Sequence, residues 1–431
     1  MLRVPAASSL SVPASSLHGS APAPSVLPEQ PRPGEVLPLT GLRIVAALWV
    51  VLFHIRGNLW TDFPGAARYL NPILEHGDLG VDLFFALSGF VLTLNYADRM
   101  GNRLTGMGTL RFLWARLARV WPAYFLTLNI AALWQGALMA TGSHNPVVPD
   151  EFSVASYLRQ ALLVVLWTES DFDRLTWNGP AWSVSAEALV YLLFPVLVLL
   201  LPRLGRVLRI RQLLLLGTAA VFPAVFFAVI TGSLYYPDLW MLRLLGAFIS
   251  GCLACMVAGR IRRTARTARL GSVAAPVIVL MVLTVFYASH YADRNFLACT
   301  VVLLFAPLLT ALAISDGGLS RLLSTRPAVF GGHISYGVYL AHMLIIEPLW
   351  WSQTEWPWLL APKTPLFRVL LLVTPALACL GGYLLWRWVE EPSRRYMRAM
   401  LAPASTVASV SVMSTASQRT EQRNGLASRS P

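Results

Sequence analysis

Residues 42–54 read LRIVAALWVVLFH, an apolar run interrupted only by Arg43 near its start and His54 at its end. About 20 apolar residues in a helix cross the hydrocarbon core of a bilayer, so this run is a candidate membrane helix. Similar runs recur near 41–58, 79–97, 120–140, 154–168, 181–202, 212–231, 239–258, 273–290, 296–314, 334–352 and 366–388. The repetition predicts an all-α, polytopic membrane helix bundle.

The composition agrees with a lipid environment. Of the 431 residues, 56% are hydrophobic and 13% are charged, whereas a soluble domain has about 25% charged residues. The formal net charge of +13 comes almost entirely from arginine, since Lys363 is the single lysine. These arginines lie in short segments between apolar runs, which is the positive-inside pattern. A nucleic-acid-binding protein would gather them on one soluble face, so we expect no nucleic-acid partner.

The segment 154–168 decides the topology. It is about 15 residues long and contains Arg159, so it is too short to span comfortably. If it did span, the arginine clusters at 203–211 and 260–269 would both face outward, which the positive-inside rule disfavours. We therefore predict ten transmembrane helices with both termini cytoplasmic, in a bacterial-type plasma membrane. The segment 154–168 would be a re-entrant or surface helix on the outer side.

Both ends of the chain differ in composition from the centre. Residues 1–37 are rich in Pro, Ala and Ser and have no continuous apolar stretch of the kind found in a signal peptide. Residues 399–431 are polar and rich in Ser, Thr and Ala. We expect two disordered tails around a membrane domain at 38–398. The cysteines lie in apolar runs, and the pair Cys252 and Cys255 lacks the further ligands of a zinc site, so no metal is expected.

Arg43 and His54 are the first candidate functional pair. Eleven residues at 100° each make three turns plus about 20°, so both side chains share one helix face, about 16 Å apart along the axis. Ionisable groups inside a membrane span are costly and are usually functional. This face could line a polar cavity. Alternatively, both residues could simply extend their polar ends toward the two membrane interfaces.

Two further groups are expected, one in the second span and one in the cytoplasmic run that leads into the third. Arg116 and Arg119 are neighbours at i,i+3 on a helix, and two guanidinium groups on one side suit phosphate binding. Ordinary positive-inside charge would also explain them. Ser88 precedes Gly89 deep in the second span, where a small pair also allows close helix packing.

Two more candidates lie in later spans. Glu187 lies about 10 Å into its span, measured from Pro180, near the expected depth of His54. A carboxylate beside an imidazole is an acid/base arrangement. Arg243 could instead be the partner of Glu187 in a structural ion pair. His342 is expected about 13 Å into the span 334–352, either as a substrate-binding residue or as a buried, hydrogen-bonded histidine.

Taken in order, six blocks resemble the motifs of the membrane acyltransferase-3 family, also written acyl_transf_3, across residues 38–398. They are Arg43-x10-His54; Gly80 to Phe90; Arg116-x-x-Arg119 with Pro122 and Tyr124; Trp182 to Glu187, with Val184 where leucine is common; Ser335 to His342; and Glu390-Glu391-Pro392. One block alone is a weak signal, whereas six in this order are specific.

The resemblance implies an integral membrane O-acyltransferase, an enzyme that transfers groups other than amino-acyl groups. The donor would be acyl-CoA, with no tightly bound cofactor, and the acyl group is expected to be acetyl. The acceptor would be a hydroxyl of a glycan, a lipid-linked sugar or a macrolide-type metabolite, and membrane lipid would be the remaining partner. His54, Glu187 and Arg43 are the expected catalytic residues. Substrate contacts are expected from Arg116, Arg119, Tyr124, Ser88, Trp182, Arg243, Tyr339 and His342.

In this scheme His54 is the general base or is itself transiently acylated. Glu187 orients it, Arg43 stabilises donor or oxyanion charge, and Arg116 and Arg119 hold the CoA phosphates. The main alternative is a multi-pass transporter or flippase for a glycan or lipid intermediate, which inverted repeats would favour; the sequence shows no obvious repeat. A sensor or structural protein would leave the in-span His and Glu unexplained.

Overall fold

The structure is a computed structural model that describes residues 35–101, 103–143, 152–167, 177–235 and 239–401. Within these ranges every regular element is a helix, as the apolar runs predict. The two expected tails fall almost wholly at 1–34 and 402–431, outside the described residues.

Among the described residues, ten helical segments are long and apolar enough to cross a membrane, which confirms the predicted number of spans. The first five comprise α1 (Leu37–Asp62), α3 (Leu79–Met100), α4 (Gly106–Thr141), η2 with α6 (Gly179–Ala181 and Trp182–Val207) and α7 (Ile210–Thr231). The others comprise α8 (Leu239–Arg260), α9 (Ala265–Tyr291), η3 with α10 (Asn295–Leu304 and Phe305–Ile314), α12 (Arg326–Glu355), and α14, η4 and α15 (Pro365–Leu385, Trp386–Glu390 and Glu391–Met400). The cytoplasmic orientation of the ends stays a prediction.

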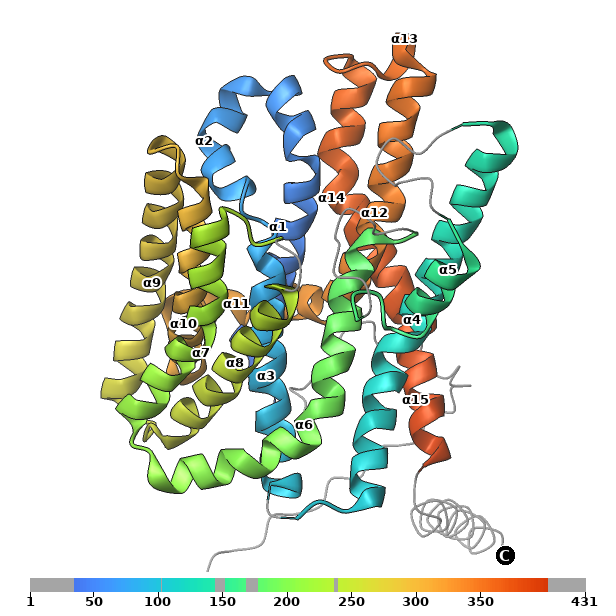
Figure 1. Ribbon diagram of the computed structural model, residues 1–431. Coiled ribbons are helices and arrows are strands. Elements are labelled where there is room, and N and C mark those ends of the chain that lie inside the picture. The colour runs from blue at the N-terminus through green and yellow to red at the C-terminus, as the bar shows by residue number, and fades with distance from the viewer. Residues whose placement is uncertain (1–34, 102, 144–151, 168–176, 236–238, 402–431) are drawn as a thin grey trace, which may run out of the picture. The chain divides into compact units, whose positions relative to one another are not determined.

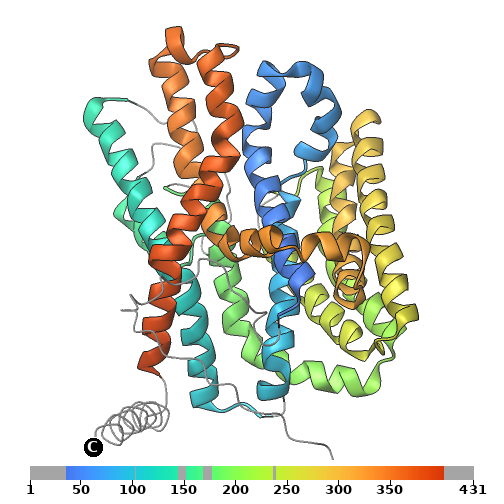
Figure 2. The ribbon, with the colours of Figure 1, turned by 180° about the vertical axis from the view of Figure 1, so that it is seen from behind.

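Short helices connect the spans in the described part of the chain. They are α2 (Pro64–Leu74), α5 (Val154–Ala161), α11 (Gly318–Leu323) and α13 (Pro357–Leu360). Helices α1, α3 and α6 lie in the middle of the bundle, between α7 to α10 on one side and α4, α12 and α14 on the other (Figures 1 and 2).

The segment 154–168 does not span, as predicted, because its helix α5 has only eight residues. The chain reverses after α5 at Leu163, whose φ is +62°. Ser185 of α6 holds this turn: its hydroxyl donates to the Leu163 carbonyl at 2.7 Å and accepts from the Val165 N–H at 2.9 Å. The indole of Trp121 on α4 donates to the Ala161 carbonyl at 3.0 Å. The turn is therefore fastened to α4 and α6.

Two glycines set the contact between α3 and α8. A Cβ added at Gly251 would lie 1.8 Å from the Ala86 carbonyl oxygen, and one added at Gly89 would lie 2.0 Å from the Phe248 carbonyl oxygen. Small residues allow such close backbone approach in membranes. The contact brings the polar residues of α3 beside those of α8.

Helix α12 packs against α1 through a similar close backbone contact at a glycine. A Cβ at Gly332 would lie 1.9 Å from the Thr40 carbonyl oxygen. Farther along α12, Tyr336 donates its hydroxyl hydrogen to the Val120 carbonyl of α4 at 2.8 Å. Helix α12 thus touches both the helix with the Arg43 and His54 pair and the helix with the Arg116 and Arg119 pair.

Candidate active site

Arg43 and His54 both face α12, as their spacing predicts. The Arg43 Nε donates to the Ser335 hydroxyl at 3.4 Å. Three turns later the His54 ring lies beside the His342 ring, with centroids 5.0 Å apart and an interplanar angle of 39°. Because the two contacts occur in the same order along both helices, α1 and α12 run parallel here.

The environment of His342 determines which of its nitrogens carries a proton. The side chain is fully buried, and its Nδ1 lies 2.6 Å from the Tyr339 carbonyl oxygen. A carbonyl can only accept a hydrogen bond, so we place the proton on Nδ1 and a lone pair on Nε2. That Nε2 is buried without a hydrogen-bond partner among the described residues. His342 therefore offers an unused acceptor beside His54.

Glu187 lies with Arg43 and Ser88 rather than with His54. The Ser88 hydroxyl donates to the Glu187 carboxylate at 2.6 Å. Arg43 and Glu187 line one small cavity of about 40 Å³ together with Phe84, Tyr336 and other residues of α3, α6 and α12. This volume holds a few water molecules at most. The expected contact between Glu187 and the His54 imidazole is not among the contacts of the described residues.

Arg43 and Glu187 of this cavity belong to a cluster of four charged side chains with Arg119 and Glu390. Arg43 and Arg119 both lie within Coulombic range of Glu187 and Glu390. Glu390 is 6% exposed and ends a π-helical turn, η4, at Trp386–Glu390. Such turns are frequent at functional sites. The sequence points to Glu390 only as part of a closing motif, because the charged groups of α1 and α4 that surround it depend on tertiary packing.

The two arginines on α4 have different surroundings. Arg116 is 8% exposed, donates from Nη2 to the Tyr96 hydroxyl at 3.2 Å and has its guanidinium carbon 5.4 Å from the Tyr96 ring centroid. Arg119 reaches the charged cluster instead. Tyr124, farther along the same helix, is 1% exposed, and its hydroxyl has no hydrogen-bond partner among the described residues.

Arg243 makes its ion pair with Asp82, so the ion pair with Glu187 that the sequence left open is not formed. The Arg243 Nη2 and Nε reach the two Asp82 carboxylate oxygens at 2.6 and 3.2 Å. Both side chains are almost fully buried. The guanidinium also lies 5.8 Å from the ring centroid of Trp182. This bidentate pair ties α3 to α8 and places Trp182 beside it.

Tyr339 ties α12 to the start of α6. Its hydroxyl lies 2.7 Å from the Ser183 hydroxyl and 2.9 Å from the Pro180 carbonyl oxygen. Its ring centroid is 5.6 Å from that of His342. The predicted site residues thus fall into three groups: the two histidines, the charged cluster with Ser88, and the Asp82–Arg243 pair with Trp182.

Taken together, the groups offer distinct chemistry at two depths of α1. Imidazoles at His54 and His342 can take up and release a proton. The arginines near Glu187 and Glu390 can hold anionic groups, since the guanidinium fork suits carboxylates and phosphates. One face of α1 thus combines groups that can bind an anion with groups that can exchange a proton.

Comparison with known proteins agrees with this description. The family model described as "Acyltransferase domain" (Acyl_transf_3) matches residues 38–387. "Acyltransferase MdmB" of Streptomyces mycarofaciens is 28% identical over 404 residues, covering 85% of this chain and 94% of that protein. "Putative peptidoglycan O-acetyltransferase YrhL" of Bacillus subtilis (strain 168) is 25% identical over 330 residues, covering 72% of this chain and 48% of that protein.

A third relative, "Nodulation protein 10" of Rhizobium leguminosarum bv. viciae, is 23% identical over 393 residues, covering 85% of this chain and 95% of that protein. No solved structure matches the chain. The family model covers most of the residues that form the ten spans. The chain therefore belongs to the acyltransferase-3 family of multi-pass integral membrane acyltransferases.

Proposed function

We propose that this O-acyltransferase takes its acyl group, an acetyl group, from acyl-CoA and transfers it to a hydroxyl of a glycan, a lipid-linked sugar or a macrolide-type metabolite. The observation on which the proposal chiefly rests is the pair of imidazole rings, His54 and His342, centred 5.0 Å apart between two parallel helices. The names of the relatives, two of which contain the word acyltransferase or O-acetyltransferase, support the reaction class.

In the proposed reaction His54 takes the proton of the acceptor hydroxyl. The acceptor oxygen attacks the thioester carbonyl, the carbon–sulfur bond breaks, and the CoA thiolate leaves and regains a proton from the imidazolium. In the alternative route the His54 nitrogen attacks the thioester first, and the resulting acyl-imidazole is then attacked by the hydroxyl. Both routes give the same ester and the same free CoA.

His342 is a positioning residue in this proposal. Its Nε2 can accept a hydrogen bond, because its Nδ1 proton faces the Tyr339 carbonyl. A small movement would let His54 donate one ring N–H to that Nε2, which would leave the other His54 nitrogen free as the base. Catalytic hydrogen bonds are often incomplete until the substrate binds.

The donor would bind at the charged cluster. Arg43 lies about 16 Å from His54 along α1, too far to stabilise an oxyanion formed at His54. It suits the charge of the donor instead, together with Arg119 and Arg116. Glu187, held by Ser88, would fix the orientation of these arginines. The pantetheine arm of CoA would then extend along the face of α1 and bring the thioester to His54.

The test is transfer of label from radiolabelled acetyl-CoA in membranes that contain the protein. His54→Ala should abolish transfer while the protein remains inserted at wild-type level. His333→Ala is the matched control, because His333 also lies on α12 but outside the site, and it should retain transfer. Full activity in His54→Ala would refute the mechanism. Solute movement in proteoliposomes without acyl-CoA would instead support the transporter alternative.

A further inference from the structure

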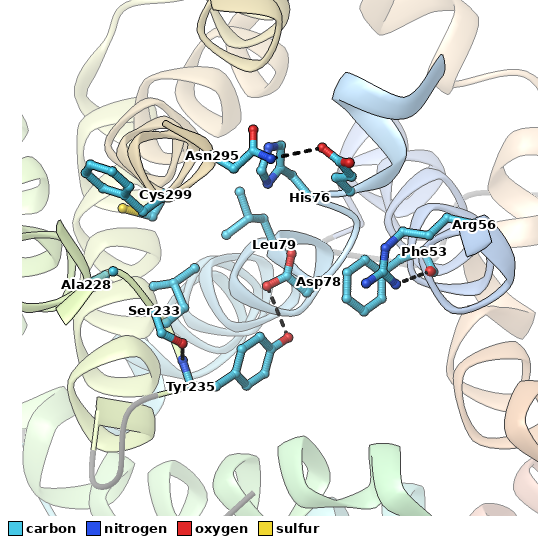
Figure 3. A pocket seen from close by; sticks show the side chains of 14 residues that line it. Phe53, Arg56, His76, Asp78, Leu79, Ala228, Ser233, Tyr235, Asn295 and Cys299 are labelled. Carbon is cyan, nitrogen blue, oxygen red and sulfur yellow. Dashed lines mark hydrogen bonds between the residues drawn. The ribbon is translucent and has the colours of Figure 1, made fainter. Parts of the chain in front are cut away.

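A second, larger cavity lies at the end of α1 that holds His54 (Figure 3). Its volume is about 270 Å³. Its walls come from the end of α1, the turn between α2 and α3, the segment after α7, and η3. We call it the vestibule and define it by six of its lining residues: Phe53, Arg56, His76, Asp78, Tyr235 and Asn295. None of these belongs to the site residues that the sequence predicts.

One aromatic ring both lines the vestibule and contacts His54. The Phe53 ring lines the cavity and meets the His54 ring edge-on, with centroids 5.2 Å apart. Arg56 fixes that ring from the other side: its guanidinium carbon lies 3.9 Å from the Phe53 centroid, and its Nη1 donates to the Phe53 carbonyl at 2.5 Å. A ligand in the vestibule would therefore lie against the Phe53 ring, which contacts His54.

The polar groups of the vestibule are mixed in kind, and its charged side chains are one arginine, Arg56, and two carboxylates, Glu75 and Asp78. Asp78 accepts a hydrogen bond from the Tyr235 hydroxyl at 3.0 Å, and Asn295 donates to Glu75 at 3.3 Å. His76 Nε2 is buried without a hydrogen-bond partner among the described residues. Figure 3 shows Asp78, Tyr235 and Arg56 around the same opening.

This chemistry selects among ligand classes. An acyl chain would displace water from the carboxylates and the arginine of this cavity without offering them hydrogen bonds, which is costly. The CoA phosphates would meet two carboxylates and one arginine, and the net negative charge would repel them. A ring with several hydroxyls can both donate to carboxylates and accept from Arg56. The volume lies near the lower end of ligand pockets, which hold about 300–1,000 Å³.

We propose that the vestibule binds the acceptor, and that the bound group is a hydroxyl-bearing sugar ring. This inference rests on the proposed acyl transfer, because it assigns the acceptor end of that reaction. A hydroxyl of the ring would reach His54 when the Phe53 side chain turns away from the imidazole.

The test is protection of an introduced thiol by a simple sugar. Ser233 is exposed and lines the vestibule, so Ser233→Cys should react with a membrane-impermeant maleimide. Every protein in this assay also carries Cys299→Ala, because the native Cys299 thiol lines the same cavity. Methyl β-D-glucopyranoside should slow the labelling. Its permethylated form, which has no hydroxyl donors, should not. Ala292→Cys is the matched control, exposed at the end of α9 and outside the vestibule lining, and should be labelled without protection.

Polar recognition is tested by Asp78→Asn and by Arg56→Gln. Each should raise the sugar concentration for half-protection roughly tenfold, the effect of one lost polar contact of about 1.4 kcal/mol. If Asp78→Asn does not fold, Arg56→Gln gives the same measurement on the opposite wall. Equal protection by the permethylated sugar, or no protection by methyl β-D-glucopyranoside, overturns the assignment.

The protection assay needs no acyl transfer and is repeated with His54→Ala. Protection together with absent transfer from radiolabelled acetyl-CoA would refute the proposed function and leave a sugar site. Transfer to an acceptor without protection of the thiol introduced by Ser233→Cys would keep the proposed function and refute the vestibule as its acceptor site.

Discussion

The His54 and His342 rings lie 5.0 Å apart between α1 and α12, with the Nε2 of His342 buried and unused among the described residues. A small movement of one ring would let His54 donate a ring N–H to this Nε2. Since the Tyr339 carbonyl holds the Nδ1 proton of His342, the pair has one defined direction for hydrogen bonding.

His342→Phe should therefore lower kcat by roughly tenfold to hundredfold, because His54 loses the acceptor that orients it. The variant keeps an aromatic ring in the buried site, so the KM for acetyl-CoA should stay unchanged. The measurement is the pH–rate profile of kcat with wild-type protein and His342→Phe side by side. A merely structural role would lower the amount of folded protein and leave kcat and its pH profile as they are.

Ser88→Ala should weaken donor binding through Glu187. The serine hydroxyl donates to this half-buried carboxylate at 2.6 Å, and a hydrogen bond to a charged group contributes about 1.5–3 kcal/mol. We expect a roughly tenfold rise in the KM for acetyl-CoA, and a similar rise with Glu187→Gln. Because the two residues act through one hydrogen bond, the double variant should be no worse than Glu187→Gln alone. Additive effects would show that Ser88 serves close helix packing, the alternative that its neighbour Gly89 suggests.

Arg243→Met should destabilise the protein by about 3–5 kcal/mol, because it leaves the buried Asp82 carboxylate unpaired. Asp82→Leu combined with Arg243→Met should recover most of that loss, since a buried ion pair is often replaceable by apolar side chains. Thermal unfolding followed by size-exclusion chromatography measures both. If the double variant is as unstable as Arg243→Met, Arg243 has a further essential contact, for which the nearby Trp182 ring is the candidate.

The ten spanning helices could be predicted because each apolar run is long enough to cross a membrane. The run that contains the eight-residue α5 could be excluded from the spans because it is too short. The shared face of Arg43 and His54 followed from helix geometry alone. The partner of each residue did not follow, because it depends on which helices pack together. Asp82 and Arg243 meet only because Gly89 and Gly251 let α3 and α8 approach closely.

The vestibule was less predictable still. Arg56 lies in the second half of α1, Asp78 precedes the first residue of α3, and His76 lies in a turn. No spacing rule relates them to Tyr235, which follows α7 in the chain. Only the packing of four separate segments brings these residues around one cavity.

His76 gives a final prediction, on the stability of the vestibule wall at low pH. Its ring stacks on Phe286 with centroids 5.1 Å apart. Burial lowers the pKa of His76 to about 4, with His290 and Arg56 acting in the same direction and Glu75 opposing them. In the unfolded chain His76 titrates near pH 6.5. Between about pH 6.5 and 4 the unfolded state therefore binds more protons than the folded state, and stability falls as the pH is lowered.

His76→Gln removes this titration, so its melting temperature should depend less on pH than that of the wild type across this window. The difference in free energy of unfolding between wild type and His76→Gln should narrow as the pH falls. The change should be at most about 2 kcal/mol, because the His76 ring is partly exposed. Thermal unfolding at pH 7, 6, 5 and 4 measures the slope. His333→Gln is the control, since His333 lies on α12 and is not among the groups that shift the pKa of His76; it should retain the pH dependence that His76 causes. Equal slopes in His76→Gln and wild type would show that protonation of another group, and not of His76, weakens the fold in acid.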